Sequence, residues 1–316
     1  MLHITNGESV IHGFREASLP GAYLSWADVL HDGPVPYTAT LTQLSDVRAE
    51  ALSRFGWGTY EEIRAAFAAR DRALADFHTH EEVVLWFEHD LFDQLQLIQV
   101  LDWLSAQEFG NVRLSLIQID SFPGIRPFYS LGQLTGVQLA ELFPARKTVT
   151  AAQMLIARDA WRAFSAPNPE SLLVLTHHGL SELPFLGAAL MRFFQEYPAV
   201  RDGLSRTQRQ ILRAVESGAR RKRDIYFGSR QFEDCPWGDA SIYWRIDALA
   251  FAPRPALSKI SDDEFQLTES GQRLLAGDAD WVALSGGIDV WLGGVHLSGA
   301  EPAWRWDNDQ RTLRRR

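Results

Sequence analysis

The sequence contains almost no cysteine. Its one cysteine, Cys235, is alone among 316 residues, so an internal disulfide and a zinc site made of several cysteines are both excluded. A single thiol is typical of proteins from a reducing compartment, and we therefore expect a cytoplasmic location.

Long apolar runs and the best-known nucleotide motifs are also absent. No apolar stretch reaches the roughly 18 residues of a membrane-spanning helix. The chain starts with a strand-like segment, residues 2–5, in place of a basic segment and a long apolar run, so we expect neither a secretion signal nor a membrane partner. The G-x-G-x-x-G and P-loop patterns are missing as well.

Positive charge is scarce in the first half of the chain. Residues 1–150 hold 10 Lys and Arg against 19 Asp and Glu, whereas residues 151–316 hold 21 of each kind. An acidic surface repels a bare polyanion, so the first half is a poor candidate for nonspecific nucleic-acid binding.

Apolar runs and helical periodicities alternate in the first part of the chain. The predicted strands cover residues 2–5, 22–26, 83–87 and 112–119. The predicted helices cover residues 10–17, 41–55, 59–78 and 91–106. Alternation of strands and helices predicts an α/β fold with a Rossmann-like, mainly parallel sheet over residues 1–130.

The second part of the chain is mostly helical in pattern. We expect a helical connecting region over residues 131–200. Residues 201–316 then predict three helices, a hairpin near 257–267 and a closing helix, which is a winged-helix-like order, followed by a Trp-rich tail.

Charged side chains follow the predicted core strand 83–87 directly. Glu88, His89 and Asp90 come first, and Asp93 and Gln94 lie in the helix that follows. Charged groups are costly to bury, so their place beside a core strand needs a reason.

Polar groups also follow the first two strands: His3, Asn6, Gly7 and Ser9 lie in or after the first strand, and Asp28, His31 and Asp32 after the second. Parallel strands bring such groups to one edge, where open α/β sheets bind ligands.

Two interpretations of this edge remain open. Carboxylate and imidazole groups suit a divalent cation such as Mg²⁺, Mn²⁺ or Zn²⁺, and they also suit general acid–base catalysis. The same groups serve equally as helix caps and as buried hydrogen bonds that fix the loops, and Asp90 or Asp93 would then meet the dipole at a helix start. The turn at Asn6 and Gly7 is likewise either a phosphate site at a helix start or a plain N-cap.

Other chemistries have weaker patterns. No serine lies in a G-x-S-x-G turn, and Cys235 has no nearby His in the sequence. His177, His178 and His296 lack a ligand spacing, so we interpret them as structural or surface groups. The predicted recognition helix 239–247 has Arg245 as its one basic residue, which disfavours DNA binding without excluding it.

Several segments resemble a bacterial family known only as a domain of unknown function. They are His3–Ser9, Trp26–Pro34, Trp86–Gln94 and Leu131–Leu134. Two later segments, Leu204–Thr207 and Trp291–Leu297, are similar to the companion domain usually found beside it. The resemblance covers most of the chain and implies relatives, but it carries over no catalytic residue.

The leading hypothesis is that the amino-terminal edge binds a small phosphorylated or nucleotide-like ligand, followed by hydrolysis or group transfer, with metal assistance as an option. Asp28, Glu88, Asp90 and Asp93 would hold a cation or activate water, and His31 and His89 would act as acid, base or ligand. His3, Asn6, Gly7, Ser9, Asp32 and Gln94 would bind the ligand. The alternative is a regulatory or scaffolding protein whose winged-helix-like part binds a partner protein or DNA.

Overall fold

The computed structural model describes residues 1–38, 40–177, 180–233 and 237–315. The chain divides into two compact units, residues 1–190 and residues 191–316. The predicted connecting region, 131–200, falls mainly in the first unit.

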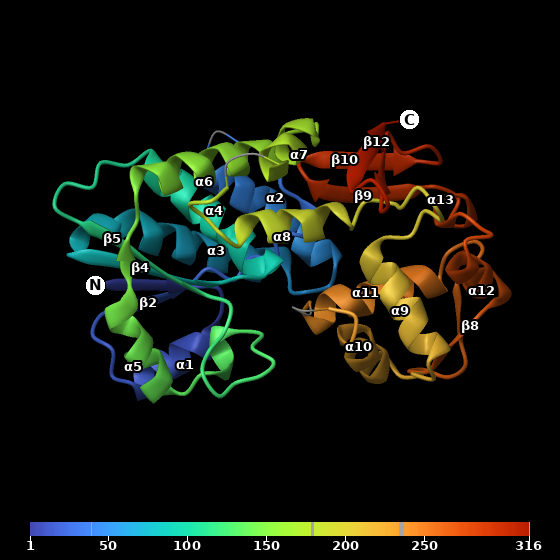
Figure 1. Cartoon of the computed structure of the whole chain (residues 1–316), viewed down its shortest axis with the longest axis horizontal. Coiled ribbons are helices and arrows are strands. Elements are labelled where there is room, and N and C mark those ends of the chain that lie inside the picture. Colours follow the sequence, from blue (N-terminus) through green and yellow to red (C-terminus); the bar gives the residue numbers. More distant parts are fainter. Residues whose placement is uncertain (39, 178–179, 234–236, 316) are drawn as a thin grey trace. The chain divides into compact units, whose positions relative to one another are not determined.

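The first unit is built on a five-stranded sheet in the order β2-β1-β4-β5-β6 (Figure 1). The strands are β1 (Leu2–Thr5), β2 (Ala22–Ser25), β4 (Glu82–Glu88), β5 (Arg113–Ile119) and β6 (Lys147–Thr148). The strands β1, β2, β4 and β5 run parallel to one another, and β6 pairs antiparallel with β5. The predicted α/β class and mainly parallel sheet are confirmed. The short strand β6 was not predicted, because two residues are too few to show a periodicity.

The central strand β4 is buried along its entire length. A parallel strand covered on both faces reads as a continuous apolar run, and residues 83–87 are such a run. The helix that follows, α4 (Leu91–Ser105), is also buried over most of its length, so it lies in the middle of the unit and not on its surface.

Helices cover both faces of the sheet (Figure 1). Helices α1 (Glu8–Glu16) and α5 (Gly136–Leu142) pack on the face that carries Trp86, in a core that includes Phe14 and Leu139. On the other side, α4 packs against α6 (Ala151–Phe164), and α3 (Tyr60–Ala75) packs against α2 (Leu41–Arg54). The remaining elements of this unit are the short strand β3 (Gly33–Pro34), the 3₁₀ helices η1 (Asp76–Thr79), η2 (Leu131–Gln133) and η3 (Phe143–Ala145), and helix α7 (Glu170–His177). Helix α8 (Leu186–Phe194) crosses the boundary between the units.

The second unit contains helices followed by small antiparallel hairpins. Its helices are α9 (Arg206–Glu216), α10 (Lys222–Arg230), α11 (Asp239–Ala250), α12 (Glu269–Ala276) and α13 (Trp281–Leu284). Its strands are β7 (Leu257–Lys259), β8 (Phe265–Leu267), β9 (Ile288–Gly293), β10 (Val295–Gly299), β11 (Trp304–Asp307) and β12 (Thr312–Arg315). The predicted order of three helices, a hairpin and a closing helix is present, while the winged-helix assignment itself stays a prediction.

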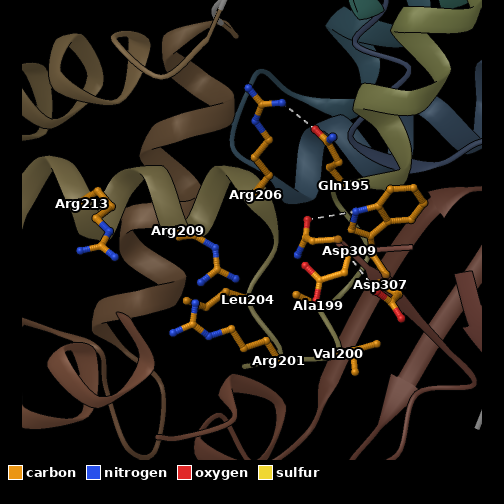
Figure 2. A pocket seen from close by; sticks show the side chains of 12 residues that line it. Gln195, Ala199, Val200, Arg201, Leu204, Arg206, Arg209, Arg213, Asp307 and Asp309 are labelled. Carbon is orange, nitrogen blue, oxygen red and sulfur yellow. Dashed lines mark hydrogen bonds between the residues drawn. The ribbon is translucent and has the colours of Figure 1, made fainter. Parts of the chain in front are cut away.

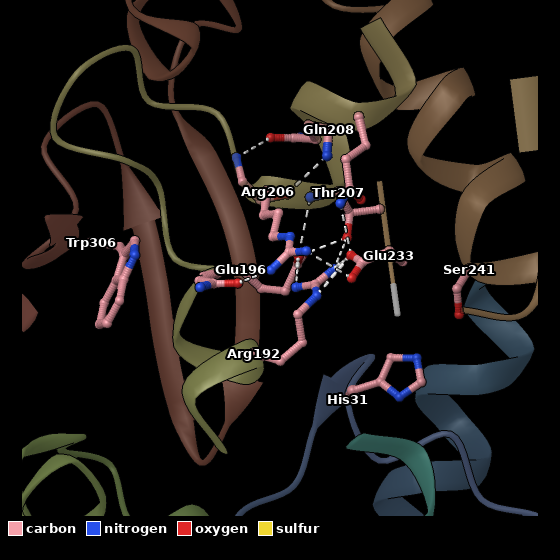
Figure 3. A network of polar contacts seen from close by, with 12 residues as sticks. His31, Arg192, Glu196, Arg206, Thr207, Gln208, Glu233, Ser241 and Trp306 are labelled. Atoms are coloured by element: carbon pink, nitrogen blue, oxygen red, sulfur yellow. Dashed lines mark hydrogen bonds and ion pairs between the residues drawn. The ribbon is translucent and has the colours of Figure 1, made fainter. Parts of the chain in front are cut away.

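A network of ion pairs fixes the start of α9 to the end of α8 (Figure 3). Arg192 donates to Glu196 at 2.7 Å and to Thr207 at 2.8 Å, and it also pairs with Glu233. Burial alone would raise the pKa of Glu196, but the positive charges of Arg192 and Arg245 outweigh burial and lower it. Glu196 is therefore ionised, and it holds the first turn of α9 in place.

No helix in the described parts of the chain combines the length and the apolar character that crossing a membrane requires.

Glu82 tests how far a buried carboxylate stabilises the sheet. It lies at the start of β4 and accepts hydrogen bonds from Ser115 at 2.7 Å and from Arg146 at 2.9 Å. Burial alone would raise its pKa, but the hydrogen bonds from Arg146, Ser115 and Arg113 hold the pKa at about 2, below its ordinary value of 4.5. Glu82→Gln should cost about 1.5–3 kcal/mol of unfolding free energy at pH 7.

The sign of the pH effect follows from the lowered pKa. The stabilisation is fully present above pH 4.5 and is lost as the pH falls toward 2, so the gap between wild type and Glu82→Gln should close over that range. Urea unfolding at pH 7, 4 and 3 measures the gap. A gap that stays constant with pH would show that the charge of Glu82 contributes nothing.

Candidate functional site

The carboxyl ends of β1 and β4 lie at a reversal in the strand order of the sheet. From β1 the chain goes to β2 on one side, and it later returns to β4 on the other side. Thr5, the last residue of β1, is paired with Trp86 of β4 and with Ser25 of β2. Ligands of open α/β sheets bind in the crevice at such a switch point.

Two buried carboxyl groups meet at this point. Glu88 ends β4 and Asp93 lies in the first turn of α4, and their side chains are 1% and 0% exposed. The backbone N–H of Glu88 donates to Asp93 Oδ1 at 2.7 Å, and the amide of Asn6 donates to both carboxyl groups. We call Glu88 and Asp93 the carboxyl pair.

Three neighbouring groups hold the carboxyl pair in position. Asn6, in the loop after β1, donates from Nδ2 to Glu88 Oε2 at 3.2 Å and also to Asp93 Oδ2. The backbone N–H of Leu131, at the start of η2, donates to Glu88 Oε1. Gln94 Nε2 donates to the backbone carbonyl of Glu88 at 2.5 Å. Three separate chain segments thus converge on two acids.

None of these partners is a cation. Among the described residues, no Lys, Arg or His side chain forms an ion pair with Glu88, Asp90 or Asp93. Burial raises the pKa of Glu88 to about 7, and burial and the charge of Glu88 raise the pKa of Asp93 well above its ordinary value. Both shifts favour the protonated form of the carboxyl pair.

Asp90 has a capping role. It is the N-cap of α4, and its Oδ1 accepts the N–H of Asp93 at 2.8 Å. Burial and the charge of Asp93 raise the pKa of Asp90, although backbone N–H groups at the helix start stabilise its charged form. The capping interpretation is thus confirmed for Asp90, which lies beside the carboxyl pair.

Two buried oxygen atoms close to the carboxyl pair have no hydrogen-bond partner in the described structure. They are Thr5 Oγ1, at the end of β1, and Oε1 of Gln94. Thr5 is 1% exposed and Gln94 is fully buried. A buried polar atom without a partner is costly, so such atoms often mark a place where a ligand or water binds.

The start of α1 lies directly after Asn6. Gly7 is the N-cap, provides no side-chain cap, and has open space where a Cβ would stand. Ser9 is exposed in the first turn, and a Cβ on Gly132 would lie 2.7 Å from its Oγ. The first N–H groups of α1 thus lack a side-chain partner, as an anion site at a helix start requires.

Asp28 is engaged elsewhere, in a buried ion pair. Arg48 Nη2 lies 2.9 Å from Asp28 Oδ1, and both side chains are fully buried. The same guanidinium group donates to the carbonyl oxygens of Val29 and Asp32. Asp28 therefore fixes the loop after β2 against α2, and among the described residues it forms no hydrogen bond or ion pair with the carboxyl pair.

The histidines are placed separately. His3 accepts a hydrogen bond from Trp86 Nε1 at 3.0 Å and lies 3.2 Å from the carbonyl of Pro20, and burial lowers its pKa, so it is a neutral core residue. His31 and Asp32 are buried, with 3.7 Å between Nε2 and Oδ2. His89 is partly exposed and lies over the ring of Phe128.

Among the described residues, no group of three or more His, Cys, Asp or Glu side chains is arranged to hold a metal ion. Cys235 and His178 lie outside the described residues. His177 is exposed at the end of α7, and His296 pairs with Asp289 on the surface of β10.

The predicted recognition helix corresponds to α11. Its basic residue Arg245 is 6% exposed, donates to the carbonyl of Ser241 at 2.7 Å, and lies over the rings of Trp237 and Trp244. A guanidinium group held in this way is turned toward the interior and not toward a groove of DNA.

Sequence reasoning found Asn6, Glu88, Asp90, Asp93 and Gln94, which the structure brings into direct contact. It missed two partners: the backbone N–H of Leu131, which donates to Glu88, and Arg48, which pairs with Asp28. The segment 131–134 was singled out for its resemblance, but a backbone donor leaves no mark on the residue type that carries it.

No protein-family model matches the chain. A search of curated proteins finds no match either.

The raised pKa of Glu88 predicts how its removal changes stability with pH. An acid whose folded pKa is about 7 and whose ordinary value is 4.5 stabilises the fold at low pH and loses that advantage as the pH rises to 7. The wild type should therefore lose about 3 kcal/mol relative to Glu88→Gln between pH 4.5 and pH 8.

Glutamine can keep part of the network, because its Oε1 can accept from Leu131 and its Nε2 can donate to Asp93, while the 3.2 Å hydrogen bond from Asn6 to Oε2 is lost. Denaturant unfolding of both proteins at pH 4.5, 6 and 8 gives the comparison. A variant less stable than wild type at pH 8 would contradict the raised pKa.

Asp28→Asn should destabilise the protein at pH 7, in contrast to Glu88→Gln. Removing its charge leaves Arg48 buried without its counter-charge, so we expect a loss of about 3–5 kcal/mol at pH 7. The same unfolding experiment measures this loss, and a change below about 1 kcal/mol would mean that Arg48 finds another partner or solvent.

Proposed function

We propose that the carboxyl edge of β1 and β4 binds a small phosphorylated or nucleotide-like ligand and catalyses hydrolysis or group transfer with the carboxyl pair as the proton donor and acceptor. The observation that carries the proposal is a pair of buried carboxyl groups, Glu88 and Asp93, which lie at the switch point, share the amide of Asn6 and form no ion pair with a Lys, Arg or His among the described residues. A fold gains no stability from such a pair, which supports a functional reason for it.

The chemistry follows from the protonation state. General acid–base catalysis is most effective when the pKa of the group lies near the working pH, and the pKa of Glu88 is raised to about 7 by burial. A protonated carboxyl group can donate to a leaving oxygen, and the partner carboxylate can then accept a proton from water. Asn6 positions both acids through its amide N–H groups.

The start of α1 suits the anionic part of the ligand. Its uncapped N–H groups follow Asn6 directly, so an anion bound there would lie close to the carboxyl pair. A protonated pair repels a phosphate less than two carboxylates would, so the raised pKa values are compatible with anion binding.

The finer assignments of the protein belong to the same proposal. We infer a Rossmann-like amino-terminal domain, a winged-helix-like arrangement of α9–α12, a cytoplasmic location, and kinship with the bacterial family that the sequence motifs resemble. The element orders of the two units support the first two assignments.

Ligand-induced thermal shifts test binding. A panel of inorganic phosphate, ribose 5-phosphate, and adenosine mono-, di- and triphosphate is added to wild type, Glu88→Gln and Asp93→Asn. At least one ligand should raise the Tm of wild type, since saturation at 100 times Kd adds about 2.7 kcal/mol. At least one of these shifts should be absent in both variants.

Glu81→Gln is the matched control, because Glu81 is exposed before the opposite end of β4. It should show the wild-type shift. Phosphate release from the ligand that binds, followed from pH 5 to 9, should decline above pH 7 as Glu88 loses its proton. A panel without any shift, or equal shifts in all four proteins, would overturn the proposal.

A further inference from the structure

The second unit contains a pocket of about 700 Å³ (Figure 2). Ala199, Leu204 and the buried Trp306 line its base. The volume lies within the range of about 300–1,000 Å³ that is typical of small-molecule sites. All residues that line the pocket belong to residues 191–316, so it is separate from the carboxyl pair.

Arginines from two segments line one side of this pocket. Arg209 and Arg213 are four residues apart on α9 and so share a face of that helix, and Arg201 comes from the loop before it. Figure 2 shows Arg201 and Arg209 close to each other on this side, away from Asp309. Guanidinium groups from two segments can thus act on one ligand.

These arginines retain donors for a ligand. Arg201 makes a hydrogen bond to the carbonyl of Ala276 at 2.6 Å, and within the described parts of the chain it pairs with no carboxylate. Arg209 donates from Nη1 and Nη2 to the buried Asp202, which fixes the guanidinium group and leaves Nε–H and two other N–H groups. Arg213 pairs with Glu216 on the exposed surface.

Hydrogen-bonding groups of another kind lie on the opposite side. The carboxylate of Asp309 is exposed and accepts no hydrogen bond from the residues that the structure describes, whereas Asp307 is held by Arg314 at 3.1 Å. Asn308 accepts from Trp306 Nε1 at 3.1 Å, which leaves its amide N–H groups for a ligand. This side therefore offers a free carboxylate and a free amide donor.

We propose that this pocket binds a small sugar phosphate. The phosphate lies against Arg201, Arg209 and Arg213, since guanidinium groups match several phosphate oxygens at once. The sugar hydroxyls donate to Asp309 and accept from Asn308. A polymer with a phosphodiester backbone fits less well, because Asp307 and Asp309 would repel its next phosphates.

Isothermal titration calorimetry of the full chain with glucose 6-phosphate, inorganic phosphate and glucose tests the pocket. Glucose 6-phosphate should bind with one site per chain, inorganic phosphate more weakly, and glucose without measurable heat. Arg201→Gln should weaken glucose 6-phosphate about tenfold, as loss of a charge-assisted hydrogen bond does. Asp309→Asn should weaken glucose 6-phosphate but not inorganic phosphate.

Arg273→Gln is the matched control, because Arg273 is exposed on α12 and its hydrogen bond also goes to a backbone carbonyl, that of Asp278. It should bind like wild type. If Arg201→Gln fails to fold, Arg213→Gln replaces it, since Arg213 is exposed.

Three outcomes would overturn the inference: equal affinities in Arg201→Gln and Arg273→Gln, glucose 6-phosphate binding that is lost in Glu88→Gln, or a labelled single-stranded oligonucleotide whose binding depends on Arg201. The second outcome would place the ligand at the carboxyl pair. If the thermal shifts do not depend on Glu88, the proposal for the carboxyl pair fails, but the binding of glucose 6-phosphate to the pocket can still be confirmed. The two proposals can therefore fail separately.

Discussion

Burial of a carboxyl group at the end of the central strand is the constraint around which the amino-terminal unit is arranged. Strand β4 must be apolar because both of its faces are covered, and Glu88 is buried with it. Asn6 in the loop after β1, Gln94 in the first turn of α4 and the backbone N–H of Leu131 at the start of η2 all donate hydrogen bonds to Glu88. Glu88 thereby holds three chain segments in place.

Four other buried acids are satisfied differently. Asp28, Glu82, Glu196 and Asp202 each have an arginine partner. A guanidinium group offsets the cost of burying a carboxylate, and the lowered pKa values of Glu82 and Glu196 show that these charges are held. Among the residues that the structure describes, Glu88 and Asp93 have no arginine partner, and their pKa values are raised. This contrast distinguishes the carboxyl pair from the acids whose charge an arginine holds.

The sequence predicted the fold best where patterns are long and local. The apolar run at 83–87, the helix after it and the polar turn after β1 were all placed correctly, because burial on two faces leaves a continuous pattern. The two-residue strand β6 and the partner of Asp28 were not predicted. Arg48 looks like any surface arginine of a helix in the sequence, and only the packing of α2 against the loop after β2 reveals its role.

The sequence by itself determined that acids follow the core strand and that polar loops follow its neighbours. Tertiary structure alone decided which of these groups meet: it joined Asn6, Glu88 and Asp93, and it bound Asp28 to Arg48. It also assembled the arginine-lined pocket from three segments of the second unit. The physical reason is that residue type fixes what a side chain can donate, accept or titrate, whereas its charge state depends on burial and on partners that are distant in the chain.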